Sequence, residues 1–323
     1  MRLGCYDAGQ PSTLIETAFT MTSFCIIGLG KMGGNMARRL VKGGVKPVVL
    51  DLDPSLTQAL AGELGCTGAA SVQEAVAALQ GPKVVWLMLP SGEVTENMIA
   101  QVRPHLQAGD LLVDGANSQY KDAQRRAASL AQAGIEFADV GVSGGVHGLA
   151  NGYCLMVGAS PGAYARLKPY LEVLAAKADT GLLHAGPVGA GHYVKMVHNG
   201  IEYGMMQALG EGFAMLDAKK EFEIDTAKVA ELWRHGSVVR SWLLDLTADA
   251  LKEDPRLAGI KPVVADSGEG RWTAQEAVDL GIPTPVMSLA LMMRFASQGQ
   301  GGFGAKLLAK MRQGFGGHAV QKH

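Results

Sequence analysis

The sequence predicts an α/β protein in which a doubly wound parallel sheet is followed by an all-helical C-terminal domain. Three observations support this fold class. Short apolar runs alternate with alanine- and leucine-rich helical stretches up to about residue 185, and only helical patterns are strong after that residue. A glycine-rich turn also follows the first apolar run. Strands that alternate with helices are typical of βαβ units and a parallel sheet. A chain of 323 residues is long enough for two domains.

The expected strands are short apolar runs, the first of which is "SFCIIGLG". They occupy residues 23–30, 47–53, 83–90, 110–117, 135–142 and 153–159. The helical stretches between them include residues 32–43, 71–80, 94–107 and 119–133. We expect the sheet to end near a Gly/Pro-rich hinge, "LLHAGPVGAG", at residues 182–191.

After this hinge the pattern is helical. Residues 190–219 can form one helix of about 45 Å, at about 1.5 Å per residue. Further helices are expected at residues 225–236, 238–254, 273–280, 285–298 and 303–313. We therefore place a sheet domain at 23–188 and a helical domain at 189–323. Residues 1–20 have no strong period and no secretory-signal pattern. Because Met21 lies two residues before the first strand, residues 1–22 are expected to be an N-terminal extension that can be disordered, or to reflect a misassigned start.

The composition excludes several classes of function. The formal net charge is −1, so nothing electrostatic favours binding to nucleic acid. No apolar run approaches the roughly 18 residues that a membrane span needs. The four cysteines (Cys5, Cys25, Cys66 and Cys154) are scattered, without a CxxC pair or a His/Cys cluster at metal spacing. They favour a reducing, cytoplasmic location and argue against a metal site.

The turn after the first strand carries a dinucleotide-binding pattern. "GLGKMG" comprises Gly28, Leu29, Gly30, Lys31, Met32 and Gly33. Gly28 permits the tight turn, Gly30 lets the backbone approach a pyrophosphate, and Gly33 allows the helix to pack closely on the strand. The N–H groups and dipole at the helix N-terminus favour phosphate. We therefore predict a Rossmann-type domain that binds a dinucleotide.

Two carboxylates after the second strand bear on the choice of cofactor. Asp51 and Asp53 lie in "DLDPS", about 20 residues after the glycine turn, which is the spacing of the acidic residue in this pattern. A carboxylate there accepts hydrogen bonds from ribose hydroxyls and repels a 2′-phosphate, and this segment holds no arginine. NAD is the expected cofactor, with NADP as the alternative.

Two further strand ends are candidates for contact with a substrate. Ser143, Gly144 and Gly145 follow a strand at its carboxyl end, where ligands of such sheets bind. Their hydroxyl and N–H groups suit a carboxylate or a hydroxyl-rich substrate, although a simple turn is the alternative. Asn117, in "DGANS", could contact both the nicotinamide and the substrate.

The long helix begins with an unusual set of polar residues, in "GAGHYVKMVHNGIEYGMMQALGEG" (189–212). At about 100° per residue, Lys195, His198, Asn199 and Glu202 fall within roughly one third of the circumference. A solvated Lys–Glu face is the alternative, but the i, i+7 spacing of Lys195 and Glu202 is poor for a surface pair. The stripe is therefore a candidate site.

Together these motifs resemble the short-chain type of 6-phosphogluconate dehydrogenase (decarboxylating), within the β-hydroxyacid dehydrogenase superfamily. The run "KMVHNGIEY" carries the most specific likeness. "GVSGGVHG", "DGANSQYKD", "EGRWTAQEAVDLGIP" and "RQGFGGH" also resemble that family, so the likeness extends over residues 23–318.

The resemblance implies oxidative decarboxylation of 6-phosphogluconate to ribulose 5-phosphate and CO2, a step of the pentose phosphate pathway that needs no metal. Lys195 would accept the C3 hydroxyl proton while hydride passes to the nicotinamide, and would then polarise the ketone. Glu202 would donate a proton to C1. An amine with an ordinary pKa of about 10.4 is protonated at neutral pH, so this role for Lys195 requires desolvation to lower its pKa.

The resemblance also implies binding residues. The sugar acid would be held by Asn117, Ser143, Gly144, Gly145, His198, Asn199 and Tyr203, while Leu89, Pro90 and Ser91 would lie along the cofactor. In a homodimer or homotetramer, the C-terminal tail would lend Arg312 and His318 to a neighbour. Longer members have a phosphate-binding lysine where this chain has Ser267, and an arginine that we align with the glycine-rich residues 297–305. Arg312, His318, Arg240 and Arg271 are the candidate replacements, and the last two could equally be structural.

Two other functions fit parts of the sequence. Another β-hydroxyacid dehydrogenase, acting on 3-hydroxyisobutyrate or a glycerate-type acid, would keep Lys195 and Asn199 without requiring Glu202 or releasing CO2. A non-catalytic NAD-binding scaffold would lack the lysine, and Lys195 is present.

Overall fold

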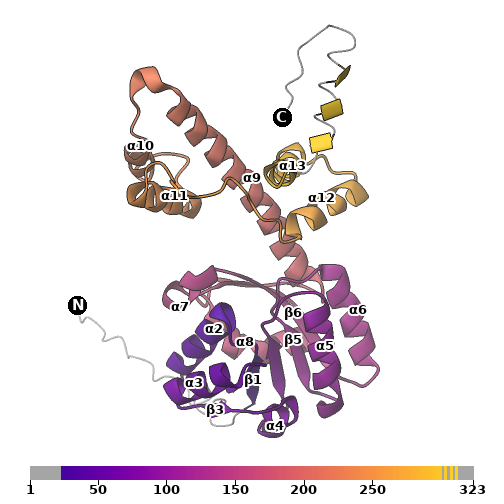
Figure 1. Cartoon of the computed structure of the whole chain (residues 1–323). Coiled ribbons are helices and arrows are strands. Elements are labelled where there is room, and N and C mark those ends of the chain that lie inside the picture. Colours follow the sequence, from indigo (N-terminus) through magenta and orange to yellow (C-terminus); the bar gives the residue numbers. More distant parts are fainter. Residues whose placement is uncertain (1–22, 300–301, 304–305, 308–309, 312–323) are drawn as a thin grey trace, which may run out of the picture. The chain divides into compact units, whose positions relative to one another are not determined.

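The computed structural model describes residues 23–299, 302–303, 306–307 and 310–311 (Figure 1). The chain divides into two compact units, one that ends at Lys195 and one that begins at Met196. The first unit contains the sheet, and the second is helical.

The first unit is built on one eight-stranded sheet, in the order β3-β2-β1-β4-β5-β6-β7-β8. The strands are β1 (Phe24–Ile27), β2 (Val48–Leu50), β3 (Thr67–Gly68), β4 (Val84–Leu87), β5 (Leu111–Asp114), β6 (Glu136–Ser143), β7 (Cys154–Gly158) and β8 (Leu182–Gly186). In register, Ile26 of β1 lies opposite Val49 on one side and Trp86 on the other. The chain leaves β1 toward β2 and later returns to its other side as β4, so the strand order reverses there. This is the topological switch point of a Rossmann-type sheet.

The sheet differs from the prediction at two places. Residues 153–159 were expected to add a parallel strand, but β7 pairs antiparallel with β6. Only the short helices η2 (Gly145–His147) and α7 (Gly148–Asn151) separate the two strands, which is less than the dozen or more residues that a parallel crossover needs. The predicted hinge contains β8, which lies parallel to β7 after the crossover helix α8 (Pro161–Leu174).

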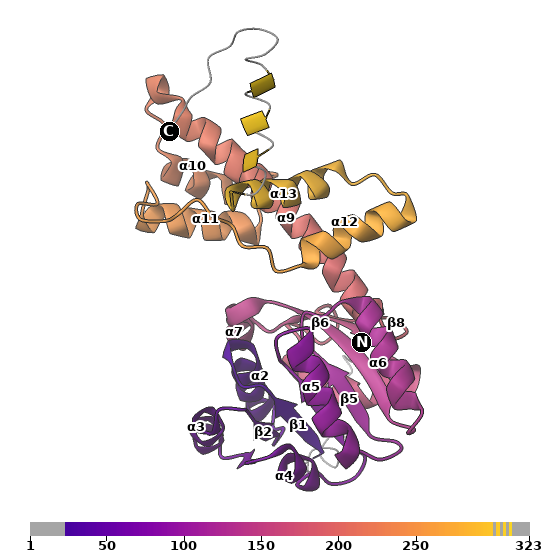
Figure 2. The same ribbon diagram turned by 45° about the vertical axis from the view of Figure 1, so that its right-hand side comes forward.

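Alternate residues of β1 contribute to cores on opposite faces of the sheet. Phe24 and Ile26 pack in a core that contains residues of α2 (Lys31–Lys42), α3 (Pro54–Leu64) and α8. Cys25 and Ile27 pack in a core that contains residues of α4 (Val72–Ala77), α5 (Glu93–Val102) and α6 (Tyr120–Ala131), the helices visible beside β1 and β5 in Figure 2. Because both faces are covered, the strands read as continuous apolar runs without a period of two.

Among its described residues, the regular secondary structure of the second unit is helical. Most of it consists of α9 (Ala190–Ala218), α10 (Thr226–Trp233), α11 (Trp242–Glu253), α12 (Glu269–Leu280) and α13 (Pro285–Ser297). The C-terminal part of α9 shares a small core with α10 and α11, to which it contributes Leu209 and Phe213. Earlier in the helix, Tyr203 packs with Ala290 and Leu291 of α13. The helix predicted at 303–313 falls largely outside the described residues.

Candidate active site

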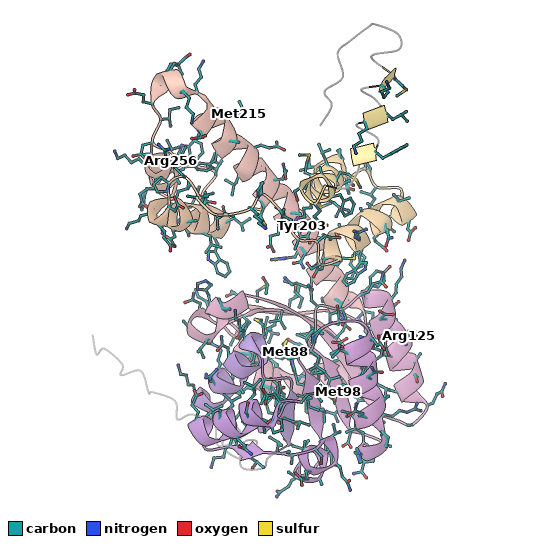
Figure 3. All side chains as sticks on the ribbon, in the orientation of Figure 1. Met88, Met98, Arg125, Tyr203, Met215 and Arg256 are labelled. Atoms are coloured by element: carbon teal, nitrogen blue, oxygen red, sulfur yellow. The ribbon has the colours of Figure 1, made fainter. Side chains whose placement is uncertain are left out.

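The glycine turn after β1 has the geometry that the fingerprint predicts. Gly28 has φ +97°, and a Cβ there would lie 2.3 Å from the carbonyl oxygen of Met88, a residue labelled in Figure 3. A Cβ on Gly33 would lie 1.8 Å from the carbonyl oxygen of Gly28. A Cβ on Gly30 would meet nothing within 4 Å, so this position faces open space. The N-cap of α2 makes no side-chain hydrogen bond and its first turn holds no acidic residue, which leaves its N–H groups suited to a pyrophosphate.

Asp51 connects the end of β2 to this turn. Its Oδ2 accepts a hydrogen bond from the N–H of Leu29 at 2.6 Å, and its Oδ1 accepts one from Asp53 N–H at 2.9 Å. Asp51 also lines a cavity of about 700 Å3 together with Leu52, Gln73 and neighbouring residues. The residues present therefore fit a dinucleotide, with the carboxylate at the position predicted for the ribose.

Asp53 has a second, structural role. It is the N-cap of α3, where its Oδ1 accepts hydrogen bonds from Ser55 N at 2.9 Å and Ser55 Oγ at 2.7 Å. These bonds lower the pKa of Asp53, because they favour its charged form. The cap position explains part of the "DLDPS" pattern without a ligand.

The turns after β4 and β5 are held by buried polar contacts. Thr95 Oγ1 donates to the carbonyl oxygen of Pro90 at 2.8 Å, which fixes the turn that contains Leu89, Pro90 and Ser91. Asp114, at the end of β5, accepts from Ala116 N–H at 3.0 Å and from Arg126 Nη1 at 2.5 Å. Arg126 is buried and also lies 2.9 Å from Glu96 of α5. This pair was not predicted from the sequence, because an arginine on an amphipathic helix usually indicates a solvated face.

The predicted substrate residues of the first unit follow adjacent strands. Asn117 comes three residues after the end of β5, and Ser143 is the last residue of β6. Gly144 and Gly145 continue the chain with φ +128° and +52°. Since β1, β4, β5 and β6 are neighbouring parallel strands, their carboxyl ends lie along one edge of the sheet. The glycine turn, the Leu89 turn, Asn117 and Ser143 thus follow one another along this edge.

The polar stripe lies on α9 as predicted. His198 Nδ1 lies 3.2 Å from Asn199 Oδ1 and 3.8 Å from Glu202 Oε2. The side chains of His198 and Glu202 are 38% and 41% exposed, whereas Asn199 is buried. Lys195 is half-buried, one turn before Asn199 on the same helix. Helical geometry thus presents an amine, an imidazole, an amide and a carboxylate along one stripe.

Tyr203 lies next to a cation that was not predicted from the sequence. Its buried ring, labelled in Figure 3, lies 3.4 Å from the guanidinium carbon of Arg294, measured to the ring centroid. Arg294 also donates to the carbonyl oxygen of Ala265 at 2.8 Å. Tyr203 Oη lies 3.4 Å from Ser267 Oγ, which donates to Glu269 Oε2 at 2.6 Å. The signal in the sequence was a lone arginine within the apolar run "MSLALMMRFA".

The other candidate cations have different surroundings. Arg271 forms an ion pair with Asp266 and lies 4.3 Å from the ring centroid of Phe295, which supports a structural role. Arg240 lines an apolar cavity of about 340 Å3 in the second unit, together with Phe213 and residues near it. Arg312 and His318 lie outside the described residues.

The described residues also bear on membrane and metal binding. None of their helices is both long and apolar enough to cross a membrane. Within the same part of the chain, no three His, Cys, Asp or Glu residues are grouped as metal ligands would be.

Family models match both units of the chain. The model described as the NAD binding domain of 6-phosphogluconate dehydrogenase matches residues 23–184. The model described as the 6-phosphogluconate dehydrogenase C-terminal domain matches residues 191–322. The two matches together extend over most of the chain.

Individual relatives carry the same name. An NAD(+)-dependent, decarboxylating 6-phosphogluconate dehydrogenase of Haloferax volcanii is 39% identical over 298 residues, which cover 92% of this chain and 98% of that protein. An NADP(+)-dependent enzyme of Bacillus subtilis is 38% identical over 285 residues, which cover 84% of this chain and 60% of that protein. The solved 6-phosphogluconate dehydrogenase of Plasmodium falciparum matches with a TM-score of 0.79 and 29% identity, over 93% of this chain and 66% of that one. Relatives with either cofactor therefore occur.

Proposed function

The chain belongs to the 6-phosphogluconate dehydrogenase family, and we propose that it converts 6-phosphogluconate to ribulose 5-phosphate and CO2 with reduction of NAD(P). The observation that carries this proposal is the stripe on α9, where Lys195 precedes the group of His198, Asn199 and Glu202. A dehydrogenase that only oxidises an alcohol needs a base, whereas a decarboxylating one also needs a proton donor for the carbon that loses CO2.

The proposed roles follow from the chemistry of each group. Lys195, as the neutral amine, accepts the proton of the C3 hydroxyl and then, as the ammonium, donates a hydrogen bond to the C3 ketone. That hydrogen bond stabilises the negative charge that develops on the ketone oxygen as the C1 carboxylate leaves as CO2. Loss of CO2 leaves an enediolate whose oxygen stays hydrogen-bonded to the Lys195 ammonium. Glu202, as the carboxylic acid, then donates a proton to the carbon that carried the carboxylate, which is C2 of the substrate and C1 of the product, and the ketone re-forms at the neighbouring carbon. Asn199 and His198 orient the sugar acid by hydrogen bonds.

The proposed cofactor site lies along the carboxyl edge of the sheet. The nicotinamide cofactor, when bound, accepts a hydride from the substrate. Residues 28–33 would hold its pyrophosphate, Asp51 its ribose, and Leu89, Pro90, Ser91 and Asn117 its nicotinamide half. The open space at Gly30 and the cavity beside Asp51 support this placement. We propose NAD as the preferred cofactor, because a 2′-phosphate would meet the carboxylate of Asp51.

We propose that Ser143, Gly144, Gly145 and Asn117 bind the sugar acid together with the α9 stripe. For the phosphate we propose Tyr203 and Arg294. A guanidinium has five N–H donors, and its planar fork can bind two phosphate oxygens at once. Two contacts support this phosphate site: Arg294 lies over the ring of Tyr203, and Tyr203 Oη lies near Ser267 Oγ. Ser267 carries no charge, so in this proposal Arg294 supplies the positive charge that binds the phosphate.

We also propose a homodimer or homotetramer in the cytoplasm, in which the tail that contains Arg312 and His318 completes the site of a neighbour. Large apolar side chains are exposed on the described helices of the second unit, among them Met215, Leu232 and Val286, and they support burial against another subunit. The free thiols of Cys25, Cys66 and Cys154 are compatible with a reducing compartment.

A comparison of substrates tests the proposed function. We expect kcat/KM for 6-phosphogluconate to exceed that for 3-hydroxyisobutyrate, glycerate and unphosphorylated gluconate by several orders of magnitude. Preference for 3-hydroxyisobutyrate or glycerate would instead assign the chain to the alternative β-hydroxyacid dehydrogenase activity. Cofactor binding without turnover of any of these acids would favour a non-catalytic role.

A further inference from the structure

Asp139 is a fully buried carboxylate that connects strand β6 to the start of helix α9. Its Oδ1 accepts a hydrogen bond from the N–H of Gly189 at 2.6 Å, and its Oδ2 accepts one from the N–H of His192 at 2.7 Å. Burial raises the pKa of Asp139, and the charge of His192 and the two N–H groups partly oppose that effect. Neither ring nitrogen of His192 has a hydrogen-bond partner among the described residues, and Asp139 bonds to the backbone N–H of His192.

One of these bonds satisfies an N–H group in the first turn of α9, that of His192, and the other satisfies the N–H of Gly189, directly before the helix. The first N–H groups of a helix have no partner within the helix, and a negative charge near them is favourable. The first turn of α9 contains no acidic residue. The acceptor is instead supplied by a strand that lies about 50 residues earlier in the sequence. Asp139 thus links two distant segments, in addition to capping the helix.

The start of α9 also lies directly on the strands. A Cβ on Gly191 would lie 2.5 Å from the carbonyl oxygens of Asp139 and Met156, and one on Gly158 would lie 2.4 Å from Asp139 Oδ1. Since no side chain fits at either glycine, the helix backbone contacts β6 and β7 with nothing between them. This close approach explains the second glycine of "GAGH", Gly191, whereas the first, Gly189, has φ +98°.

The same packing determines the position of Lys195. A Cβ on Gly141 would lie 2.4 Å from Lys195 Cβ and 3.1 Å from Lys195 Cγ, so the lysine stem rests on β6. Gly141 stands midway between Asp139 and Ser143 on that strand. One strand therefore supplies the anchor of the helix, the surface beneath the lysine and the proposed substrate serine.

We infer that Asp139 is a positioning residue, which holds the first turn of α9 on β6 and thereby keeps the Lys195 amine in place relative to Ser143. This inference rests on the proposed function, in which Lys195 is the base. Asp139 itself exchanges no proton with the substrate.

The test compares two buried aspartates with the same chemistry. In Asp139→Asn, one amide oxygen remains as an acceptor and the NH2 group faces an N–H donor. Asp110 is the matched control, because it is 1% exposed and accepts from the N–H groups of Lys83 and Gln107, both at 2.9 Å, directly before β5 begins. Asp110→Asn therefore makes the same change at the amino end of a strand, away from the proposed site.

We expect Asp139→Asn to lower kcat for 6-phosphogluconate by about tenfold to a hundredfold, the size of effect that a misplaced catalytic group produces. The Kd of NAD should stay unchanged, and kcat of Asp110→Asn should stay within about twofold of the wild type. An unchanged kcat in folded Asp139→Asn would overturn the inference, as would an equal loss in Asp110→Asn. If Asp139→Asn does not fold, Gly141→Ala provides the second variant, because its methyl group would displace the lysine stem and the carbonyl oxygen of Gly191 in the first turn of α9, and should reduce kcat similarly.

A measurement without turnover separates this inference from the proposed function. The rate at which trinitrobenzenesulfonate modifies Lys195, followed by peptide mass analysis, should change at least about threefold in Asp139→Asn and not in Asp110→Asn. An inactive wild-type protein would contradict the proposed function, and this labelling would still decide the positioning role. Identical labelling rates in all three proteins would overturn it.

Discussion

Oδ2 of Asp51 accepts a hydrogen bond from the backbone N–H of Leu29 at 2.6 Å. This bond connects the end of β2 to the glycine turn after β1, and the same carboxylate lines the adjacent cavity. A ribose diol can donate hydrogen bonds to this charge, whereas a 2′-phosphate is repelled by it. The segment that follows, Leu52–Ser55, contains no arginine to compensate.

We therefore predict that kcat/KM is higher with NAD than with NADP. Asp51→Asn should lower the ratio of kcat/KM with NAD to kcat/KM with NADP by at least about tenfold. A tenfold change corresponds to about 1.4 kcal/mol of lost discrimination between the two cofactors. Asp53→Asn is the matched control, because it removes a charge two residues away and asparagine can still cap α3. A wild-type preference for NADP, or equal effects of both variants, would contradict the proposed role of Asp51.

Lys195→Met and Glu202→Gln should separate the two proton transfers. Lys195→Met should lower the rate of oxidation by about 10²- to 10⁴-fold, the usual contribution of a general base. Glu202→Gln should leave a rapid first formation of NADH followed by slow turnover. The substitution removes the proton donor, and that proton is needed only after oxidation and loss of CO2. Stopped-flow absorbance measures both phases.

The control for Glu202→Gln is Glu211→Gln, which makes the same change on the same helix at a residue that accepts from Gln207 at 2.7 Å. Near wild-type turnover of Lys195→Met with intact cofactor binding would show that the base has been assigned wrongly.

Arg294→Gln should raise KM for 6-phosphogluconate by about tenfold to a hundredfold, because a hydrogen bond to a charged group contributes about 1.5–3 kcal/mol. KM for NAD should not change. Arg271→Gln is the control, since that arginine also lies over an aromatic ring but pairs with Asp266. If Arg271→Gln raises KM and Arg294→Gln does not, the phosphate site has been placed at the wrong arginine.

Exchange of the C-terminal tail between subunits predicts complementation. Lys195→Met and Arg312→Ala should each be nearly inactive. Mixing them under conditions of subunit exchange should restore activity, because some sites of the hybrid then combine a wild-type Lys195 with a wild-type Arg312. Mass spectrometry of the mixture verifies the exchange. Proven exchange without recovery would mean that each chain completes its own site.

The sequence was sufficient to predict most of the fold, because local signals determine it. Three such signals lie within short stretches of the sequence. They are the glycine turn with Gly28 at a positive φ, the acidic residue after the second strand, and the helical period around Lys195. The antiparallel direction of β7 was not predicted. It depends on the shortness of the connection through η2 and α7, and helices of three and four residues leave no periodic pattern.

The contacts that hold the candidate site were harder to predict. Asp139 and His192 are more than 50 residues apart, and so are Tyr203 and Arg294. No local pattern indicates that such pairs meet, because tertiary packing brings them together. Asp139 and Arg126 also look like surface residues in the sequence, and only their burial shows that they carry internal hydrogen bonds. Sequence patterns therefore located the proposed catalytic groups but not the residues that hold them.

The most direct test of the proposed activity is the ratio of CO2 to NADH formed from 6-phosphogluconate labelled with ¹³C at C1. Mass spectrometry of the released gas and absorbance of the cofactor, recorded in the same reaction, give this ratio. We predict one labelled CO2 for each NADH, with both lost together in Lys195→Met. Formation of NADH without labelled CO2 would contradict oxidative decarboxylation and leave a simple β-hydroxyacid dehydrogenase.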